Sequence, residues 1–211
     1  MRHKYFIYLF IIFMVTNGSS LTMGNMPKSE SYQIIFWDDK TKEFEDILGL
    51  DLKVLLKKNS PLFILTDKYI HKYYWDEQLI EIEYDKIKED TGDYFPMSTS
   101  IFTIVLDGSI LYHGMSRFVI GAMIREYDDH NYPVIVGRRS INPNNFILAL
   151  KPKFYPIGDI FRDYPAEEQQ KLLNMDVYKY FKEMGKIVEG RVDLTKIFAK
   201  DEPYLNSEMK N

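Results

Sequence analysis

An Asp-Gly pair between two β-rich runs constrains the fold of this chain more than any other sequence feature. Six β-favouring residues (101–106) precede Asp107-Gly108, and a second run (109–112) follows it. A two-residue turn between antiparallel strands needs a positive φ angle at both central positions, and Asp-Gly is a preferred pair there. The sequence therefore predicts a tight hairpin centred on Asp107-Gly108.

The runs on either side of this hairpin predict a fold that mixes strands and helices. Alternating or continuous apolar residues predict strands at 32–37, 79–84, 134–136 and 146–150. Helical spacing or length predicts helices at 44–58, 66–73, 115–127 and in a C-terminal segment that opens near Asp163. We expect an α+β domain with a mixed, mainly antiparallel sheet, and a C-terminal amphipathic helix packed on one face of that sheet.

The first twenty residues have the composition of a secretory signal. Arg2, His3 and Lys4 form a basic start, an apolar run (5–15) follows, and small and polar residues (16–20) close the segment. The apolar run is too short to span a bilayer comfortably as a helix. We expect an exported protein, periplasmic or extracellular, cleaved near Ser20.

The remaining chain divides into three parts. We expect a flexible linker at 21–31, because Gly, Asn, Pro, Lys and Ser mix there without periodicity. A single α+β domain then covers 32–199, long enough for a proper core. A polar tail follows at 200–211.

Charge and cysteine content exclude several classes of protein. The formal net charge is −4 and the chain has no long basic run, which argues against a nucleic-acid partner. The chain contains no cysteine, so a disulfide framework and a thiolate metal site are both excluded. An exported domain of this kind must be held together by its hydrophobic core alone.

An aromatic cluster at 69–75 supplies the first candidate binding residues. Tyr74 and Trp75 close this cluster, next to a predicted turn. Flat rings with polar tips stack on sugars or anchor a protein partner. The hypothesis is that Tyr74 and Trp75 are partly exposed and contact such a partner. The alternative is that these rings pack in the core or at its edge.

Two consecutive arginines are the second candidate. Arg138 and Arg139 follow an apolar strand, between Gly137 and Ser140. Two guanidinium groups can clasp a carboxylate, a phosphate or a sugar acid. Surface salt bridges with nearby carboxylates are the alternative, and the commoner use of exposed arginine.

The densest group of metal-ligand residue types is Asp128-Asp129-His130. Carboxylates and an imidazole can hold a divalent ion, but adjacent residues rarely point at one centre. A solvated turn is the favoured interpretation. We expect no metal site and no cofactor.

No residue pattern identifies a reaction. The motif Gly-x-Ser-x-Gly is absent, and the predicted turn explains Gly108-Ser109. Carboxylate pairs can be chosen among Asp76, Glu77, Glu81 and Glu83, but acidic strand faces are usually only solvated. The sequence therefore predicts no catalytic residue.

Part of the chain resembles small exported bacterial proteins of unknown function. The resemblance covers about residues 62–136 and is carried by Ile70, Tyr74-Trp75, Ile80-Glu81-Ile82, Phe102 to Gly108, Leu111 to Gly114 and Pro133-Val134-Ile135. It implies an exported location and a core with a Trp-bearing turn, the Asp-Gly hairpin and a Pro-Val-Ile strand. It brings no activity and no catalytic residue.

These observations favour an exported, non-enzymatic binding or scaffold domain with a protein or glycan partner at the cell envelope. Two alternatives stay open. One is a small secreted hydrolase that acts on an envelope polymer through carboxylates and His113 or His130. The other is a structural protein tethered to the membrane by an uncleaved signal.

Overall fold

The computed structural model describes residues 31–37, 47, 49–92, 95, 100–118, 133–152 and 170–199. The predicted signal (1–20), the C-terminal tail (200–211) and the linker except Ser31 lie outside the described residues. The turn Asp128-Asp129-His130 also lies outside them, as does the start of the predicted C-terminal helix.

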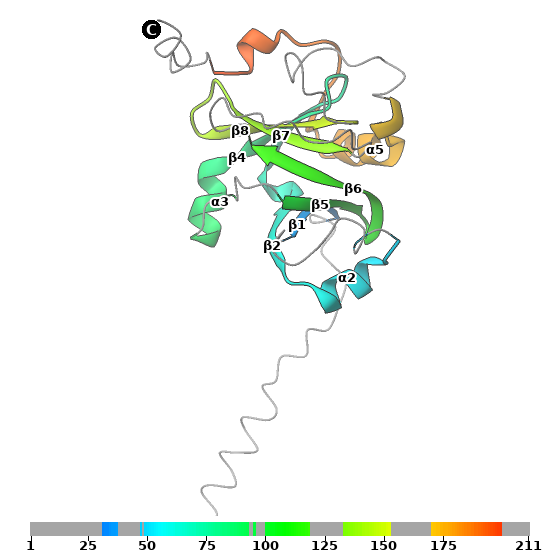
Figure 1. The fold of residues 1–211 in the computed structure, drawn as a ribbon. Coiled ribbons are helices and arrows are strands. Elements are labelled where there is room, and N and C mark those ends of the chain that lie inside the picture. Colours follow the sequence, from blue (N-terminus) through cyan, green and yellow to red (C-terminus); the bar gives the residue numbers. More distant parts are fainter. Residues whose placement is uncertain are drawn as a thin grey trace, which may run out of the picture.

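The fold is built on one nine-stranded sheet with the order β2-β1-β5-β6-β7-β8-β4-β3-β9 (Figure 1). The strands are β1 (Tyr32–Trp37), β2 (Pro61–Thr66), β3 (Ile70–Tyr74), β4 (Leu79–Glu83), β5 (Ser100–Leu106), β6 (Ser109–Phe118), β7 (Val134–Arg139), β8 (Asn145–Lys151) and β9 (Ile187–Val188). The α-helices are α2 (Leu52–Lys58), α3 (Tyr84–Thr91) and α5 (Met175–Glu183), and 3-10 helices lie at η4 (Asp67–Tyr69), η5 (Gln170–Leu172) and η6 (Leu194–Lys196).

The sheet is mixed and mostly antiparallel. Only β6 with β7 and β3 with β9 run parallel among the pairs of described strands. The prediction of an α+β domain with a mainly antiparallel mixed sheet is confirmed at this level.

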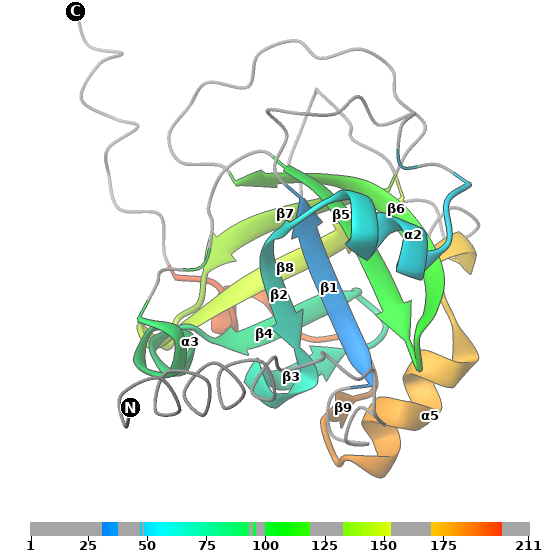
Figure 2. The same ribbon diagram turned by 90° about the horizontal axis from the view of Figure 1, so that it is seen from below.

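The sheet is strongly curved, and β2 at one end and β3 near the other end are consecutive strands in the sequence. β2 pairs with β1 at one end, β3 pairs with β4 near the other, and only η4 separates β2 from β3 in the sequence. Figure 2 shows the strands arranged around a common interior. The inner face therefore becomes the main core of the protein.

Every second residue of β1 points into that core. Tyr32, Ile34 and Phe36 are buried there, as the two-residue period of a strand requires. Phe181 of α5 closes one side, with its ring centroid 4.8 Å from that of Tyr32 and 5.3 Å from that of Tyr73.

The outer face of the sheet is covered in two places. Ile35, Trp37 and Leu55 belong to one cluster, in which α2 packs on β1 and β5. A second cluster joins Ile147 of β8 to Phe198, in the segment that follows η6. Both faces of the sheet thus carry buried apolar side chains.

Two helix predictions are wrong where strand pairing outweighs local preference. The helix expected at 66–73 is replaced by η4 and β3, because Tyr73 and Tyr74 pair with Ile80 and Leu79 across the sheet. Thr66 makes no capping side-chain hydrogen bond. Residues 115–118 of the helix expected at 115–127 belong to β6.

The connection between β5 and β6 is short. Leu106 lies opposite Ser109 in the antiparallel pair, so two residues join the strands. Asp107 has a φ angle of 49° and Gly108 one of 77°. Farther along β6, a Cβ added to Gly114 would lie 2.1 Å from the carbonyl oxygen of Pro133, so only glycine fits at this crossing.

Candidate functional site

The structure divides the four residues predicted from the sequence between the ends of β3 and β7 and does not gather them into one site. Tyr74 ends β3, and Trp75 opens the turn that leads to β4. Arg138 and Arg139 end β7, where Arg138 is half-buried and Arg139 is exposed. Tyr74 packs on the outer face of the sheet and Trp75 in the inner core, so the two rings do not form one surface.

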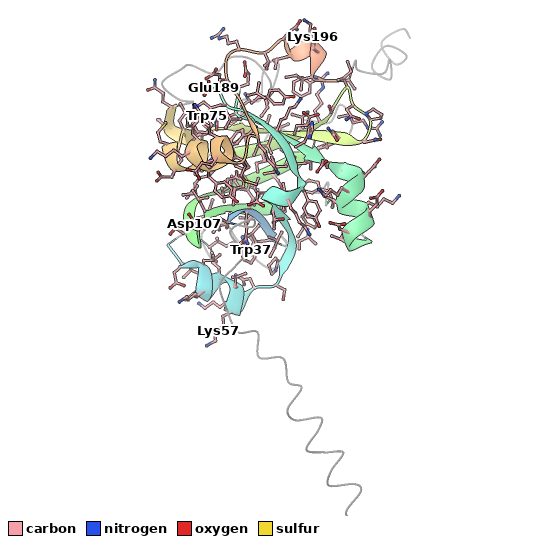
Figure 3. All side chains as sticks on the ribbon, turned by 180° about the vertical axis from the view of Figure 1, so that it is seen from behind. Trp37, Lys57, Trp75, Asp107, Glu189 and Lys196 are labelled. Atoms are coloured by element: carbon pink, nitrogen blue, oxygen red, sulfur yellow. The ribbon has the colours of Figure 1, made fainter. Side chains whose placement is uncertain are left out.

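The expectation that Tyr74 and Trp75 are partly exposed is wrong. Each of the two residues is only 9% exposed. The Trp75 ring contacts those of Tyr73 and Tyr178 edge-on, with centroids 5.6 Å and 5.1 Å away, and its backbone N–H donates to Val188 O. Figure 3 shows Trp75 beside α5 and close to the segment that contains Glu189. This burial favours core packing, and binding by these rings stays a prediction.

Tyr74 instead takes part in a polar cluster around Glu81. Its hydroxyl donates to Glu81 Oε2 at 2.9 Å, and Asn145 Nδ2 donates to Glu81 Oε1 at 2.8 Å. Ser140 Oγ lies 3.3 Å from the same Oε1 atom. Burial, followed by the hydrogen bond to Glu81, raises the pKa of the Tyr74 phenol well above its ordinary value. Tyr74 and Asn145 therefore donate to one buried carboxylate, and Ser140, whose single hydroxyl group lies between Glu81 Oε1 and Ile197 O with its oxygen 3.3 Å from each, joins it to the C-terminal segment.

The segment after η6 covers this Glu81 cluster. Ile141 N donates to Ile197 O at 2.7 Å, and Ala199 N donates to Arg139 O at 3.2 Å. The Phe198 ring lies 4.9 Å from the Arg138 guanidinium carbon. Phe198 and Ile197 pack on the same outer face as Tyr74, so Glu81 retains only 6% exposure.

The segment after η6 explains why Glu81 is buried, although its sequence pattern predicts a solvated strand face. Glu81 alternates with apolar residues along β4, a pattern typical of a solvated face, yet it is buried. The residues that cover Glu81 lie more than one hundred positions away, so the local pattern contains no signal for them. In this arrangement the Glu81 carboxylate anchors the C-terminal segment and offers no open face to a substrate.

A second polar group contains His113, which is the described histidine of the hydrolase alternative. Trp37 Nε1 donates to Thr103 Oγ1 at 2.8 Å, and the same Oγ1 atom lies 2.8 Å from His113 Nδ1. Burial lowers the pKa of the His113 imidazole. A neutral ring that accepts the Thr103 proton at Nδ1 fits this arrangement, which assigns the ring hydrogen to Nε2.

This histidine–threonine pair resembles an activated nucleophile in geometry but not in access. Thr103 is fully buried beneath Trp37 and its neighbours. A nucleophile must reach the scissile carbonyl carbon of a bound substrate, and a sealed hydroxyl cannot. We therefore assign the Trp37–Thr103–His113 chain of hydrogen bonds to the packing of the outer face.

The described residues contain no group of three acidic, histidine or cysteine side chains that could hold a metal ion. The predicted cluster Asp128-Asp129-His130 is outside this part of the chain, so the expectation of no metal stays a prediction.

An edge of the sheet offers the feature best suited to recognition. β2 forms one end of the strand order and, within the described ranges, pairs with β1 alone. Its residues Pro-Leu-Phe-Ile-Leu-Thr carry no charge. Leu62 and Ile64 are 46% and 37% exposed on the outer side of this edge. We call residues 61–66, with these two side chains, the β2 edge.

In the sequence, residues 62–65 are an apolar run with no sign of an edge position. Its length and composition equally fit a central strand, because edge position depends on pairing with distant strands. A sheet edge that lacks charges and exposes large apolar side chains is a template for another strand.

Comparisons with known proteins identify no relative: no family model, no curated protein and no solved structure matches the chain. The resemblance over about residues 62–136 stays a prediction. Each helix in the described ranges is too short or too polar to cross a membrane.

Proposed function

We propose that this chain is an exported binding or scaffold domain that engages a protein partner along the β2 edge, at the cell envelope or outside the cell. Export is supported by the basic start, the short apolar run and the polar close of the first twenty residues. Binding is supported by the sheet edge and not by the aromatic turn, since Trp75 is occupied by the core.

The observation that carries the proposal is the exposure of Leu62 and Ile64 beside an uncharged edge strand. An added strand forms main-chain hydrogen bonds with such an edge, and its alternate side chains contact those of the edge. Natural proteins generally protect edges of this kind with charge, proline or a bulge. Here the features of this kind are Pro61 at the start of β2 and a bulge at Leu62, which has no partner between the pairs Phe36–Phe63 and Trp37–Pro61.

The proposal includes two finer features of the fold. One is a tight primed turn at Asp107-Gly108, supported by the positive φ angles of both residues. The other is an amphipathic C-terminal helix on one face of the sheet, supported by the burial of Val177 and Phe181 in α5. Gly108→Val tests the turn, because a β-branched residue at positive φ costs about 1–3 kcal/mol. An unchanged free energy of unfolding would reject the primed turn.

The hydrolase alternative gains no support from the described polar clusters. Glu81 and Thr103 are both buried, so neither side chain is open to a polymer substrate. Membrane tethering by an uncut signal is decided by the same experiment that tests export.

Export is tested by N-terminal sequencing of the full chain after cell fractionation. We expect a mature protein that begins near Leu21 in the periplasmic or extracellular fraction. A chain that still begins at Met1 in the cytosol would contradict export, and one in the membrane would favour the tethered alternative.

Binding is tested by cross-linking in intact cells that express the full chain. Ile64→Lys should abolish the cross-linked product, because a charge would oppose an incoming apolar strand. Ile141→Lys is the matched control, since Ile141 is 59% exposed and lies between β7 and β8. A product that survives Ile64→Lys, or is lost equally in Ile141→Lys, would contradict binding at the β2 edge.

A further inference from the structure

We infer that the strand received by the β2 edge is β2 of a second copy of this chain, paired antiparallel about a two-fold axis. This inference rests on the proposed binding role of the β2 edge and specifies its partner. It follows from the order of side chains along the strand and from the charges at its two ends.

The side chains of β2 are self-complementary about Phe63. Ile64 lies on the same outer face as Ile35, its register partner in β1, and Leu62 is exposed beside it at the bulge between Pro61 and Phe63. When Phe63 stands opposite the partner's Phe63, Leu62 stands opposite the partner's Ile64, and the reverse pair forms at the same time. Four exposed apolar side chains then become one cluster across the two-fold axis.

The ends of β2 carry complementary charges. β2 begins three residues after α2, whose last turn exposes Lys57 and Lys58. β2 ends at η4, which contacts α3, and α3 exposes Asp85 and Glu89. Figure 2 shows α2 and α3 toward opposite ends of β2.

These charges favour one direction of pairing. An antiparallel pair brings the lysines of α2 toward the partner's Asp85 and Glu89, whereas a parallel pair would set the lysines against each other. α3 carries two cations, Lys86 and Lys88, and Lys86 pairs with Glu83, the residue before the helix, at 3.1 Å. Lys68 of η4 lies 3.6 Å from Asp90. Asp85 and Glu89 take part in neither pair.

The length of the strand limits the strength of the dimer. A standard stable interface buries about 1,600 Å² in total, more than a ladder centred on a few residues supplies. We therefore expect reversible association that depends on protein concentration, with monomer at low concentration and dimer at high concentration.

Analytical ultracentrifugation of the full mature chain over a concentration series tests the association. The weight-average mass should rise toward twice the monomer mass for the unmodified protein and for Ile141→Lys. It should stay at the monomer mass for Ile64→Lys, whose circular dichroism spectrum should match that of the unmodified protein. A monomer at every concentration, or a dimer that persists in Ile64→Lys, would overturn the inference.

Cysteine pairing tests the register, because the natural chain has no cysteine. Leu62→Cys and Ile64→Cys proteins, mixed and oxidised, should form a disulfide-linked dimer several-fold faster than either protein alone. Directly opposed Cβ atoms lie about 5 Å apart, and diagonal ones about 7–8 Å. Equal rates in all three samples would overturn the register.

Failure of this inference differs from failure of the proposed function. A chain that is monomeric throughout, yet cross-links in cells to a different protein in an Ile64-dependent way, overturns self-association and leaves binding at the β2 edge intact. Loss of both results overturns both.

Discussion

The two end strands of the sheet, β9 and β2, differ in length and in the polarity of their surroundings. β9 is only two residues long, and the chain around it is fixed by polar contacts. Lys182 pairs with Glu189 at 3.0 Å, and Gly190 N donates to Asp76 Oδ2 at 2.7 Å. The β2 edge is six residues long, carries no charge and exposes large apolar side chains.

Side chains of α5 and the residues after it also hold η4, the turn between β2 and β3. The Tyr180 hydroxyl donates to the Asp67 carboxylate, and Lys186 Nζ donates to the Asp67 backbone oxygen at 2.7 Å. Tyr178 contacts Trp75 from the same helix. The β9 end is therefore flanked by a helix and by polar contacts. The β2 edge differs from it because it is uncharged and exposes large apolar side chains.

The largest expected effect comes from breaking the closed end at its core. Phe181→Ala should lower the free energy of unfolding by about 3–5 kcal/mol, because it leaves a cavity between α5 and the sheet. Tyr32 and Tyr73 would lose their edge-on contacts with the ring. Urea denaturation measures the change.

Leu173→Ala is the control for this variant, since Leu173 is exposed just before α5. It should change the free energy of unfolding by less than about 0.5 kcal/mol. Equal losses in both variants would show that α5 does not close the sheet as described.

The second expected effect concerns the polar cover of the outer face beside the β9 end. Glu81→Ala leaves the Tyr74 hydroxyl and the Asn145 amide without their acceptor. An unsatisfied buried donor costs about 1–3 kcal/mol, so unfolding free energy should fall by that order. Glu81→Gln keeps one carbonyl acceptor and should lose less.

Limited proteolysis of the same variants locates the effect. Faster cleavage near Ile197 in Glu81→Ala is expected, because the cluster holds this segment through Ser140. Cleavage at the rate of the unmodified protein would mean that Glu81 does not anchor the C-terminal segment.

The sequence predicts these two ends unequally. The strand at 32–37, the strand before residue 84 and the Asp-Gly region are local patterns, and strands lie at those positions. The burial of Glu81 and Trp75 depends on residues beyond 177. The edge position of β2 depends on the order of the strands, in which β1 pairs with β2 on one side and with β5 on the other. Such long-range pairings leave no periodicity in a short window, so the candidate site could not be located from sequence.

A smaller effect is expected from pH on the β2 side of the sheet. The folded-state pKa of His113 is lowered by burial, so it lies below the unfolded value of about 6.5. The folded protein then binds fewer protons than the unfolded chain, and the stability from His113 is present above that value. It is lost as pH falls from about 6.5 through the folded-state pKa.

His113→Asn removes this titration, so the pH profile of the variant is the reference for the pH profile of the unmodified protein. Between about pH 7.5 and about pH 5.5, the unmodified protein should lose more unfolding free energy than His113→Asn loses. Parallel pH profiles for the two proteins would show that the Trp37–Thr103–His113 chain of hydrogen bonds does not exclude the charged imidazole.

The smallest effect on stability is expected at the β2 edge itself. Ile64→Lys should change the free energy of unfolding by less than about 0.5 kcal/mol at low protein concentration, because Ile64 is exposed in the monomer. A large loss, measured by urea denaturation, would mean that the edge is part of the core and not a free surface.

Amide hydrogen exchange at two protein concentrations tests the central claim most directly, since it reads both sheet ends in one sample. Among the amides of 62–64, those that point away from β1 should exchange fast in dilute protein and become protected at high concentration, whereas those bonded to β1 are protected throughout. Those of β9 and its neighbour β3 should exchange at rates independent of concentration. Protection of the outward-pointing amides in dilute protein, or rates there that do not depend on concentration, would contradict an open β2 edge that receives a second copy.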